Sequence, residues 1–191
     1  MKISFFSILG FALFASTAQA NVFEDIAVDN SSYDKAQFVG ELSSLGAIEV
    51  FGFRGSLFNG FLVDNDDADF YSFQINSPGL LKLSLLTPGA DPILGLFDSN
   101  GILLAEDDDS GSQLDAFLEY SVSLPGTYIA AINGWTGDNV LDFTVPGESD
   151  FPYRLQAEFQ SNLTAVPLPA GIWLLLSGLV GLVRLGQRKT I

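Results

Sequence analysis

Alternation of apolar and polar residues with a period of two is the feature of this sequence that most constrains its fold. In residues 69–75, Tyr71, Phe73 and Ile75 alternate with Ser72 and Gln74. The same alternation recurs in residues 81–85, 118–122 and 153–159. Because successive side chains of a β-strand point to opposite faces of a sheet, each segment is predicted to be a strand with one buried face.

Shorter apolar runs and turn signals extend this pattern. The runs predict further strands at residues 48–53, 56–63, 93–97, 102–105 and 128–132. Pairs such as Asn-Gly and Pro-Gly predict turns between the strands, at residues 59–60, 77–79, 88–89, 99–101, 125–126 and 133–134. Short strands separated by frequent turns are typical of a sandwich. We therefore predict an all-β chain that folds as an antiparallel, jelly-roll-like β-sandwich.

Composition excludes several classes of function. The 191 residues include no His and no Cys, so a Ser/His/Asp triad, a cysteine nucleophile, an imidazole or thiolate zinc site and a disulfide are all excluded. There are 23 acidic and 8 basic residues, and the net charge is -15. Proteins bind the phosphate backbone of nucleic acids with clustered Lys and Arg, so nucleic acid is not an expected partner.

The N-terminal residues have the organisation of a secretory signal. Residues 1–20 contain Lys2, then an apolar run, and end in Ala18-Gln19-Ala20. This arrangement predicts a signal peptide that is cleaved after Ala20, with the Sec translocon as partner. The mature chain then begins with a polar lead-in at residues 21–47, and the sandwich is expected at residues 48–160.

The C-terminal residues have the organisation of a membrane anchor. A linker is expected at residues 161–170, a transmembrane helix at residues 171–183, and a basic tail at residues 184–191. Basic residues beside a membrane helix mark its cytoplasmic side, so the tail is predicted to lie inside and the acidic body outside. The sandwich is thus predicted to be flanked by a signal peptide and a transmembrane helix.

The linker carries a motif that resembles a known sorting signal. Val166, Pro167, Leu168, Pro169 and Ala170 precede the apolar helix, and Arg184 follows it. This order resembles the PEP-CTERM signal of Gram-negative bacteria in its VPLPA variant, with Leu168 where the usual signal has Glu. The resemblance implies processing by an exosortase-type transpeptidase and an association with exopolysaccharide. It implies an exported protein, anchored in the inner membrane by its C-terminal helix and then located at the cell surface or outside the cell.

A second resemblance covers about residues 48–159. It rests on an ordered series of segments: DADFYSF at 67–73, DPILGLFD at 91–98, NG at 100–101, EDD at 106–108 and PGTY at 125–128. This series is similar to bacterial pre-peptidase C-terminal (PPC) domains. The resemblance implies a non-catalytic β-sandwich of a type that includes binders of calcium and of polymeric substrates.

Two acidic clusters are candidates for a calcium site. Dense carboxylates in loops can supply the six to eight oxygen ligands that calcium takes, although neither cluster has the spacing of an EF-hand. The alternative is that these residues form solvated turns that keep the surface soluble. The candidate ligands are Asp64, Asp66, Asp67 and Asp69 in the first cluster, and Glu106, Asp107, Asp108 and Asp109 in the second.

One aromatic residue is a candidate for carbohydrate contact. Trp135 lies between Gly134 and Thr136, where its ring would either stack on a sugar or close one end of the sandwich. Three functions remain open: a non-enzymatic cell-surface or matrix protein, a calcium-dependent polysaccharide-binding module, and a carboxylate-based glycan hydrolase. We expect the first and assign no catalytic residue. The one Asp-Ser-Gly sequence, at Asp109, lacks the second copy that an aspartic protease needs.

Overall fold

The computed structural model describes residues 18–55, 57–58, 61–62, 68–137, 141–147 and 150–162. In these residues the chain is almost entirely β-structure, with one short 3-10 turn, η1 (Tyr33–Lys35). None of the described residues forms a helix long and apolar enough to cross a membrane. Residues 1–17 of the predicted signal peptide, the sorting motif at 166–170, the predicted helix at 171–183 and Arg184 lie outside the described residues.

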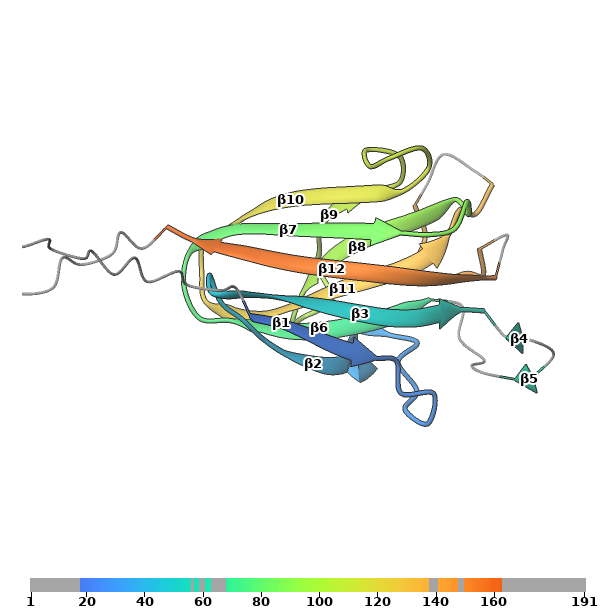
Figure 1. Ribbon diagram of the computed structural model, residues 1–191, viewed down its shortest axis with the longest axis horizontal. Helices are drawn as coiled ribbons and strands as arrows, with labels where there is room; N and C mark the ends of the chain where they lie inside the picture. Colours follow the sequence, from blue (N-terminus) through green and yellow to red (C-terminus); the bar gives the residue numbers. More distant parts are fainter. Residues whose placement is uncertain are drawn as a thin grey trace, which may run out of the picture.

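Two five-stranded sheets form the layers of a sandwich (Figure 1). The strand order in the first sheet is β1 (Ala18–Phe23), β3 (Gly46–Arg54), β12 (Phe151–Ser161), β7 (Gly79–Leu86) and β10 (Ala116–Val122). The order in the second sheet is β2 (Gln37–Leu42), β6 (Asp69–Ile75), β11 (Gly126–Gly134), β8 (Pro92–Asp98) and β9 (Leu103–Asp107). A small separate ribbon pairs β4 (Leu57–Phe58) with β5 (Phe61–Leu62), where the sequence predicts one strand.

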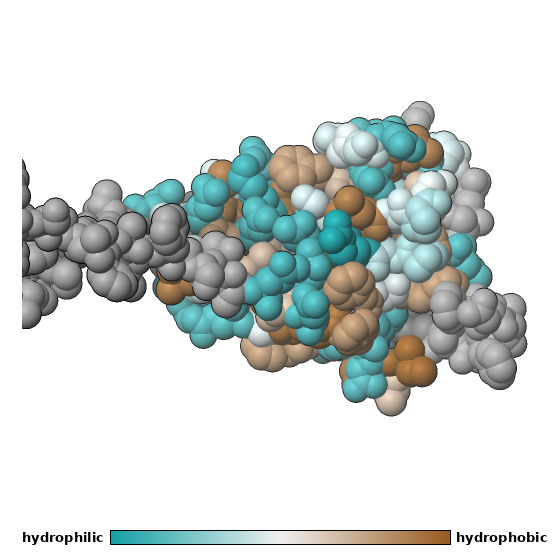
Figure 2. All heavy atoms as spheres, viewed as in Figure 1, coloured by the Kyte–Doolittle hydropathy of each residue, from teal (hydrophilic) through white to brown (hydrophobic). Residues whose placement is uncertain are grey.

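The predicted alternation is realised most clearly in β7. Leu81, Leu83 and Leu85 are buried between the sheets, and the side chain of Lys82 lies on the outer face, 2.6 Å from Glu119 of β10. Figure 2 shows hydrophilic residues along this outer face. The facing rows of both sheets form one core, so the prediction of an all-β sandwich is confirmed. Its fully buried large side chains are Tyr71, Phe73, Leu42, Ile75, Leu81, Leu83, Leu85, Leu94, Leu96, Ile132 and Leu155.

A second, smaller apolar cluster covers the outer face of the second sheet. Phe143, in the segment between β11 and β12, packs with Phe70, Ile93 and Ile129. Its ring lies edge-on to Phe97, with ring centroids 5.5 Å apart. A Cβ at Gly95 would meet the Phe143 ring at 2.7 Å, so glycine leaves the space that this ring occupies. The segment after β11 is therefore held against the sheet, and this positions the residues beside it.

One predicted turn is wrong, because Asn133 and Gly134 lie inside β11. Instead of forming a turn, the buried Asn133 side chain makes hydrogen bonds to the segment that follows β11. Its Nδ2 donates to the carbonyl oxygens of Asp142 and Val145, each at 2.8 Å, and its Oδ1 accepts from the Gly134 amide at 2.9 Å. The asparagine thus fixes residues 142–145 to the strand.

Two edge strands depart from the predicted antiparallel order. β1 runs parallel to β3, and β2 runs parallel to β6. Residues 21–47, predicted to be a polar lead-in, form the second half of β1, all of β2 and the start of β3. These strands were missed because edge strands bury little: in β2 only Leu42 is fully buried. The remaining pairings within the two five-stranded sheets are antiparallel.

The connecting loops gather at two opposite poles of the sandwich. β1 begins and β12 ends at the same pole, on the left in Figure 1, as the pairings Ala18 with Gly46 and Glu158 with Ala47 require. We call this the terminal pole, and its loops are residues 43–45, 76–78, 99–102 and 123–125. We call the other end the acidic pole, and its described loops are residues 24–36, 87–91, 108–115, 135–137 and 141–147.

Candidate functional site

A hollow at the acidic pole brings together two groups of residues that the sequence singled out separately. It is lined by Asp91, Asp108, Asp109, Trp135 and Leu141, and its volume is about 460 Å³. These residues come from three different connections, after β7, after β9 and after β11. The hollow therefore exists only because the strands end at a common pole.

Trp135 is held in the lining of this hollow by both its backbone and its ring. Its amide donates to the Asp91 carbonyl oxygen at 2.9 Å, which fixes the distance between two of the lining segments. Its half-buried ring packs against the cluster that contains Phe70 and Phe143. Both predicted roles of Trp135 are therefore compatible with its position, because it covers the end of the sheet and also lines an open hollow.

The four residues of the second acidic cluster, Glu106 to Asp109, differ in their contacts and exposure. Asp107 organises the loop, because its Oδ2 accepts hydrogen bonds from the amides of Ser110 at 3.1 Å and Phe117 at 2.8 Å. Glu106 is exposed on β9, whereas Asp108 and Asp109 line the hollow. Within the described ranges, no three or more acidic side chains are grouped so that they could hold a metal ion.

The first acidic cluster is described only at Asp69, since Asp64, Asp66 and Asp67 lie outside the described residues. Asp69 is fully buried at the start of β6, and its Oδ2 accepts a hydrogen bond from the Tyr153 hydroxyl at 2.8 Å. That hydroxyl lies 2.5 Å from the Tyr71 hydroxyl. Because the Tyr153 hydroxyl is the hydrogen-bond donor to Asp69, the Tyr71 hydroxyl is the donor in the bond between the two tyrosines. The chain of bonds links β12 of the first sheet to β6 of the second.

Glu24 and Asn30 lie beside this network, and neither was predicted from the sequence. The side chains of Asn30, Asp69 and Tyr71 surround the Glu24 carboxyl. Glu24 Oε2 accepts a hydrogen bond from the Phe53 amide at 2.8 Å. Glu24 Oε1 and both side-chain amide atoms of Asn30 are buried and find no hydrogen-bond partner in the described part of the chain.

The unpartnered atoms of Glu24 and Asn30 are costly for a folded protein. A buried polar group without a partner loses about 1–3 kcal/mol relative to its hydrated state. Burial also raises the pKa of the Glu24 carboxyl, and the hydrogen bond from Phe53 together with the polar side chains of Asp69, Asn30 and Tyr71 only partly opposes this shift. Burial of the Tyr153 hydroxyl, together with the nearby charge of Asp69, raises the pKa of Tyr153 well above its ordinary value. The acidic pole therefore holds a group of polar side chains beside the apolar core, and some of their buried atoms lack hydrogen bonds.

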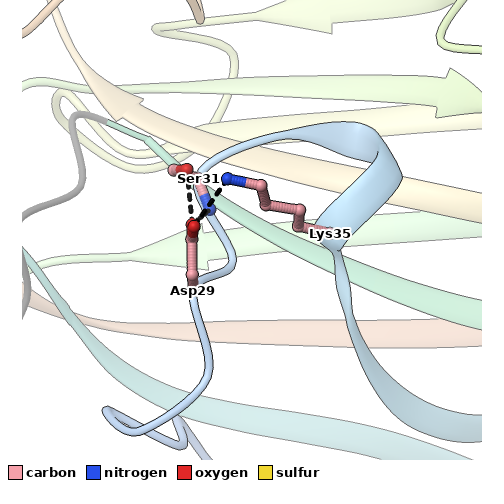
Figure 3. A network of polar contacts seen from close by, with 3 residues as sticks. All are labelled: Asp29, Ser31 and Lys35. Carbon is pink, nitrogen blue, oxygen red and sulfur yellow. Dashed lines mark hydrogen bonds and ion pairs between the residues drawn. The ribbon is translucent and has the colours of Figure 1, made fainter.

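A surface network fixes the loop that carries Asn30 (Figure 3). Asp29 Oδ2 lies 2.5 Å from the Lys35 ammonium, and Asp29 Oδ1 accepts from the Ser31 hydroxyl at 2.6 Å. These bonds lower the pKa of Asp29 to about 2. The Asn30 carbonyl oxygen accepts from the Phe70 amide at 2.9 Å, which ties the loop to β6. The backbone at Asn30 is therefore fixed both by the Asp29 network and by the hydrogen bond to Phe70.

Calcium would suit the side-chain oxygens of Glu24, Asn30 and Asp69. Glu24 Oε1, Asn30 Oδ1 and the Asp69 carboxylate are hard oxygen ligands of the kind that calcium takes. Three side chains supply only part of the six to eight ligands required, so backbone oxygens or water would have to complete the shell. The chemistry of these donors fits the predicted ion, with residues that differ from most of the predicted ligands.

No protein-family model matches the sequence, and no curated protein matches it either. The fold is similar to several solved structures. One is the pre-peptidase C-terminal domain of the collagenase from Bacillus anthracis, the type of domain that the sequence motifs resemble, with 20% identity over 65% of this chain and 96% of that domain and a TM-score of 0.40. Another is the periplasmic lysozyme inhibitor PliG from Aeromonas hydrophila, with 11% identity over 74% of this chain and 100% of that one and a TM-score of 0.44.

The fold is also similar to the surface-associated copper-binding protein CorA from Methylomicrobium album BG8, with 7% identity over 65% of this chain and 98% of that one and a TM-score of 0.42. All three TM-scores are below 0.5, and we assign no function from these likenesses.

The pKa of Glu24 leads to a testable dependence of stability on pH. The folded state binds the carboxyl proton more tightly than the unfolded chain, whose Glu24 has the ordinary pKa of 4.5. The contribution of the protonated Glu24 carboxyl to the stability of the folded state is therefore fully present below pH 4.5. It is lost as the pH rises through the raised pKa of the folded state. Glu24→Gln removes the titrating group. In thermal melts with a chelator, it is expected to raise the melting temperature at neutral pH and to flatten this part of the pH profile.

Glu106→Gln is the matched control for this experiment. Glu106 is exposed on β9, so its loss should leave the pH profile unchanged. An identical profile for Glu24→Gln and the unsubstituted chain would contradict the raised pKa.

Proposed function

We propose that the chain is an exported, non-enzymatic protein of the cell surface or extracellular matrix, and that it binds a glycan in the hollow at the acidic pole. The observation that carries the proposal is the juxtaposition of Trp135 with Asp91, Asp108 and Asp109. An aromatic ring supplies an apolar face for a pyranose ring, and carboxylate oxygens accept hydrogen bonds from sugar hydroxyls.

The charge of the site restricts the class of glycan. Three carboxylates line the hollow, and the whole chain has a net charge of -15. A polymer of uronic acids would be repelled, whereas a neutral glycan or one with free amino groups would not be. We therefore propose a neutral or amino-sugar polysaccharide as the ligand.

Substitution of Trp135 tests the glycan proposal. In titrations of the full chain in detergent, cello-oligosaccharides or chitosan oligosaccharides are expected to bind, and alginate oligosaccharides are not. Trp135→Ala should weaken binding by about tenfold or more, because the stacking surface is lost. Asp109→Asn, at an exposed position that lines the same hollow, should weaken it with little effect on the melting temperature.

The control for this titration is Phe38→Ala, which removes an exposed aromatic side chain from β2, away from the hollow. It should bind as the unsubstituted chain does. Equal affinity of Trp135→Ala and Phe38→Ala for every oligosaccharide would show that the hollow is not the glycan site.

We propose calcium binding at the acidic pole as a second function. The unpartnered buried oxygens of Glu24 and Asn30 support this proposal. Calcium would replace the missing partners of these atoms. It would also fix the loop of residues 24–36 to β6, so that binding of the ion and order at this pole would be coupled.

Calcium titration with a melting readout tests the second function. Calcium should raise the melting temperature of the unsubstituted chain, because an ion that binds only the folded state stabilises it. Glu24→Gln and Asn30→Ala should abolish this rise. Glu106→Gln should retain it if the site is the buried one. A rise that survives Glu24→Gln but disappears in Glu106→Gln would place the ion in the second acidic cluster instead.

We also propose that the chain reaches its location through the C-terminal signal. The sequence order at residues 166–184 supports this, with an exosortase-type transpeptidase as the partner. In a host that encodes such an enzyme, mass spectrometry of the surface protein should find no peptides from residues 171–191. Replacing Pro167 and Pro169 together with Ala should leave a longer, membrane-held chain, because the extended motif is disrupted.

Replacement of Pro125 with Ala is the control for this measurement, because Pro125 lies in an exposed loop of the sandwich. Recovery of residue 191 in the native surface protein would contradict the sorting proposal.

A further inference from the structure

The terminal pole differs from the rest of this acidic molecule because its loops carry no charge. Residues 43–45, 76–78, 99–102 and 123–125 consist of Ser, Asn, Gly, Pro, Leu and Ile. The nearest carboxylates lie on the adjoining strands. One of them, Asp98, turns its Oδ1 to the amides of Asn100 at 2.8 Å and Ile102 at 2.9 Å.

Large apolar side chains are exposed on three of these four loops. The exposed fraction is 70% for Leu45, 59% for Ile102 and 73% for Leu124. Isolated exposed leucines are common on protein surfaces, but here three large apolar side chains are exposed on uncharged loops of the same pole. A surface that binds this pole is therefore expected to be apolar where it contacts these three side chains, and it does not need basic groups to bind.

The chain enters and leaves the sandwich at this same pole. β1 begins here, and the end of β12 is fixed here by two hydrogen bonds. The Asn162 amide donates to the Pro78 carbonyl oxygen at 3.1 Å, and the Ser77 hydroxyl lies 3.2 Å from the Ser161 hydroxyl. The segment that leads to the predicted membrane helix therefore starts from the terminal pole.

The length of that segment keeps the pole near the membrane. Residues 163–170 separate the described chain from the predicted helix at 171–183. Eight extended residues reach at most ~28 Å, whereas the 11 residues of β12 alone span ~36 Å. The end of β12, at the terminal pole, is thus the point of the sandwich that is tethered to the bilayer.

We infer that the sandwich stands on the lipid bilayer by its terminal pole while it is anchored, with Leu45, Ile102 and Leu124 in the headgroup layer. This inference rests on the membrane anchoring in the proposed function. Apolar side chains on uncharged loops partition into the interface of a zwitterionic bilayer. The nearby carboxylates of Asp98 and Glu41, which accept hydrogen bonds from the loop residues Asn100 and Asn76, would be repelled by anionic lipids. The orientation directs the hollow of Trp135 away from the membrane, toward an extracellular polymer.

Site-specific fluorescence quenching tests the inference on the full chain. Because the chain has no cysteine, Ser123→Cys and Ser112→Cys each give one labelling site, at the terminal and acidic poles respectively. Each labelled chain is reconstituted in phosphatidylcholine vesicles that contain nitroxide-labelled lipid. We expect the label at position 123 to be quenched at least about threefold more strongly than the label at position 112. Leu45→Ser with Leu124→Ser should reduce the quenching at position 123.

Carbonate extraction of the same vesicles shows whether the chain is anchored in the membrane, independently of how the sandwich is oriented. If the chain is extracted, anchoring is wrong and the inference fails with it. If the chain remains and the two labels are quenched equally, the inference alone is wrong. A disulfide between two Ser123→Cys chains, without lipid quenching, would assign the pole to a second copy of the chain and would also overturn the inference.

Discussion

Burial of the facing apolar rows of two sheets is the interaction on which the rest of the structure depends. Rows such as Leu81, Leu83 and Leu85 of β7 and Tyr71, Phe73 and Ile75 of β6 belong to one core between the sheets, and every strand must keep its register for such rows to point inward. This requirement fixes the sandwich and leaves only the loops at its two poles free to differ. Function therefore has to be sought at the poles.

The two poles differ in charge, in buried polar groups and in their relation to the chain ends. The terminal pole holds the start of β1 and the end of β12 and has uncharged loops, whereas the acidic pole combines the hollow of Trp135 with the buried Glu24 and Asn30. Polar groups without partners are tolerated in a folded protein where a ligand repays their cost. This contrast is the physical basis for assigning the membrane to one pole and ligands to the other.

The sequence predicts the strands well where one face is buried, because alternation in β7, β10 and β12 reports that burial directly. The same alternation predicts β6, but this strand is buried on both faces because the cluster around Phe143 covers its outer side. Prediction from the sequence fails at edge strands β1 and β2, and at Asn133, whose buried amide makes tertiary hydrogen bonds that no local pattern reveals. Trp135 and the acidic loop were predicted as candidates, but their meeting with Asp91 depends on how three loops close one pole. Glu24 and Asn30 stand in an ordinary polar segment, and only tertiary burial distinguishes them.

Hydrogen exchange of the full chain in phosphatidylcholine vesicles, with and without chitosan oligosaccharides, tests the division between the poles most directly. Amides involved in ligand contacts exchange more slowly, so each segment reports its own contact. The account predicts that the oligosaccharide slows exchange in residues 87–91, 108–115 and 135–137 and leaves residues 43–45 and 123–125 unchanged. Slower exchange confined to the terminal pole, or none in any segment, would contradict it.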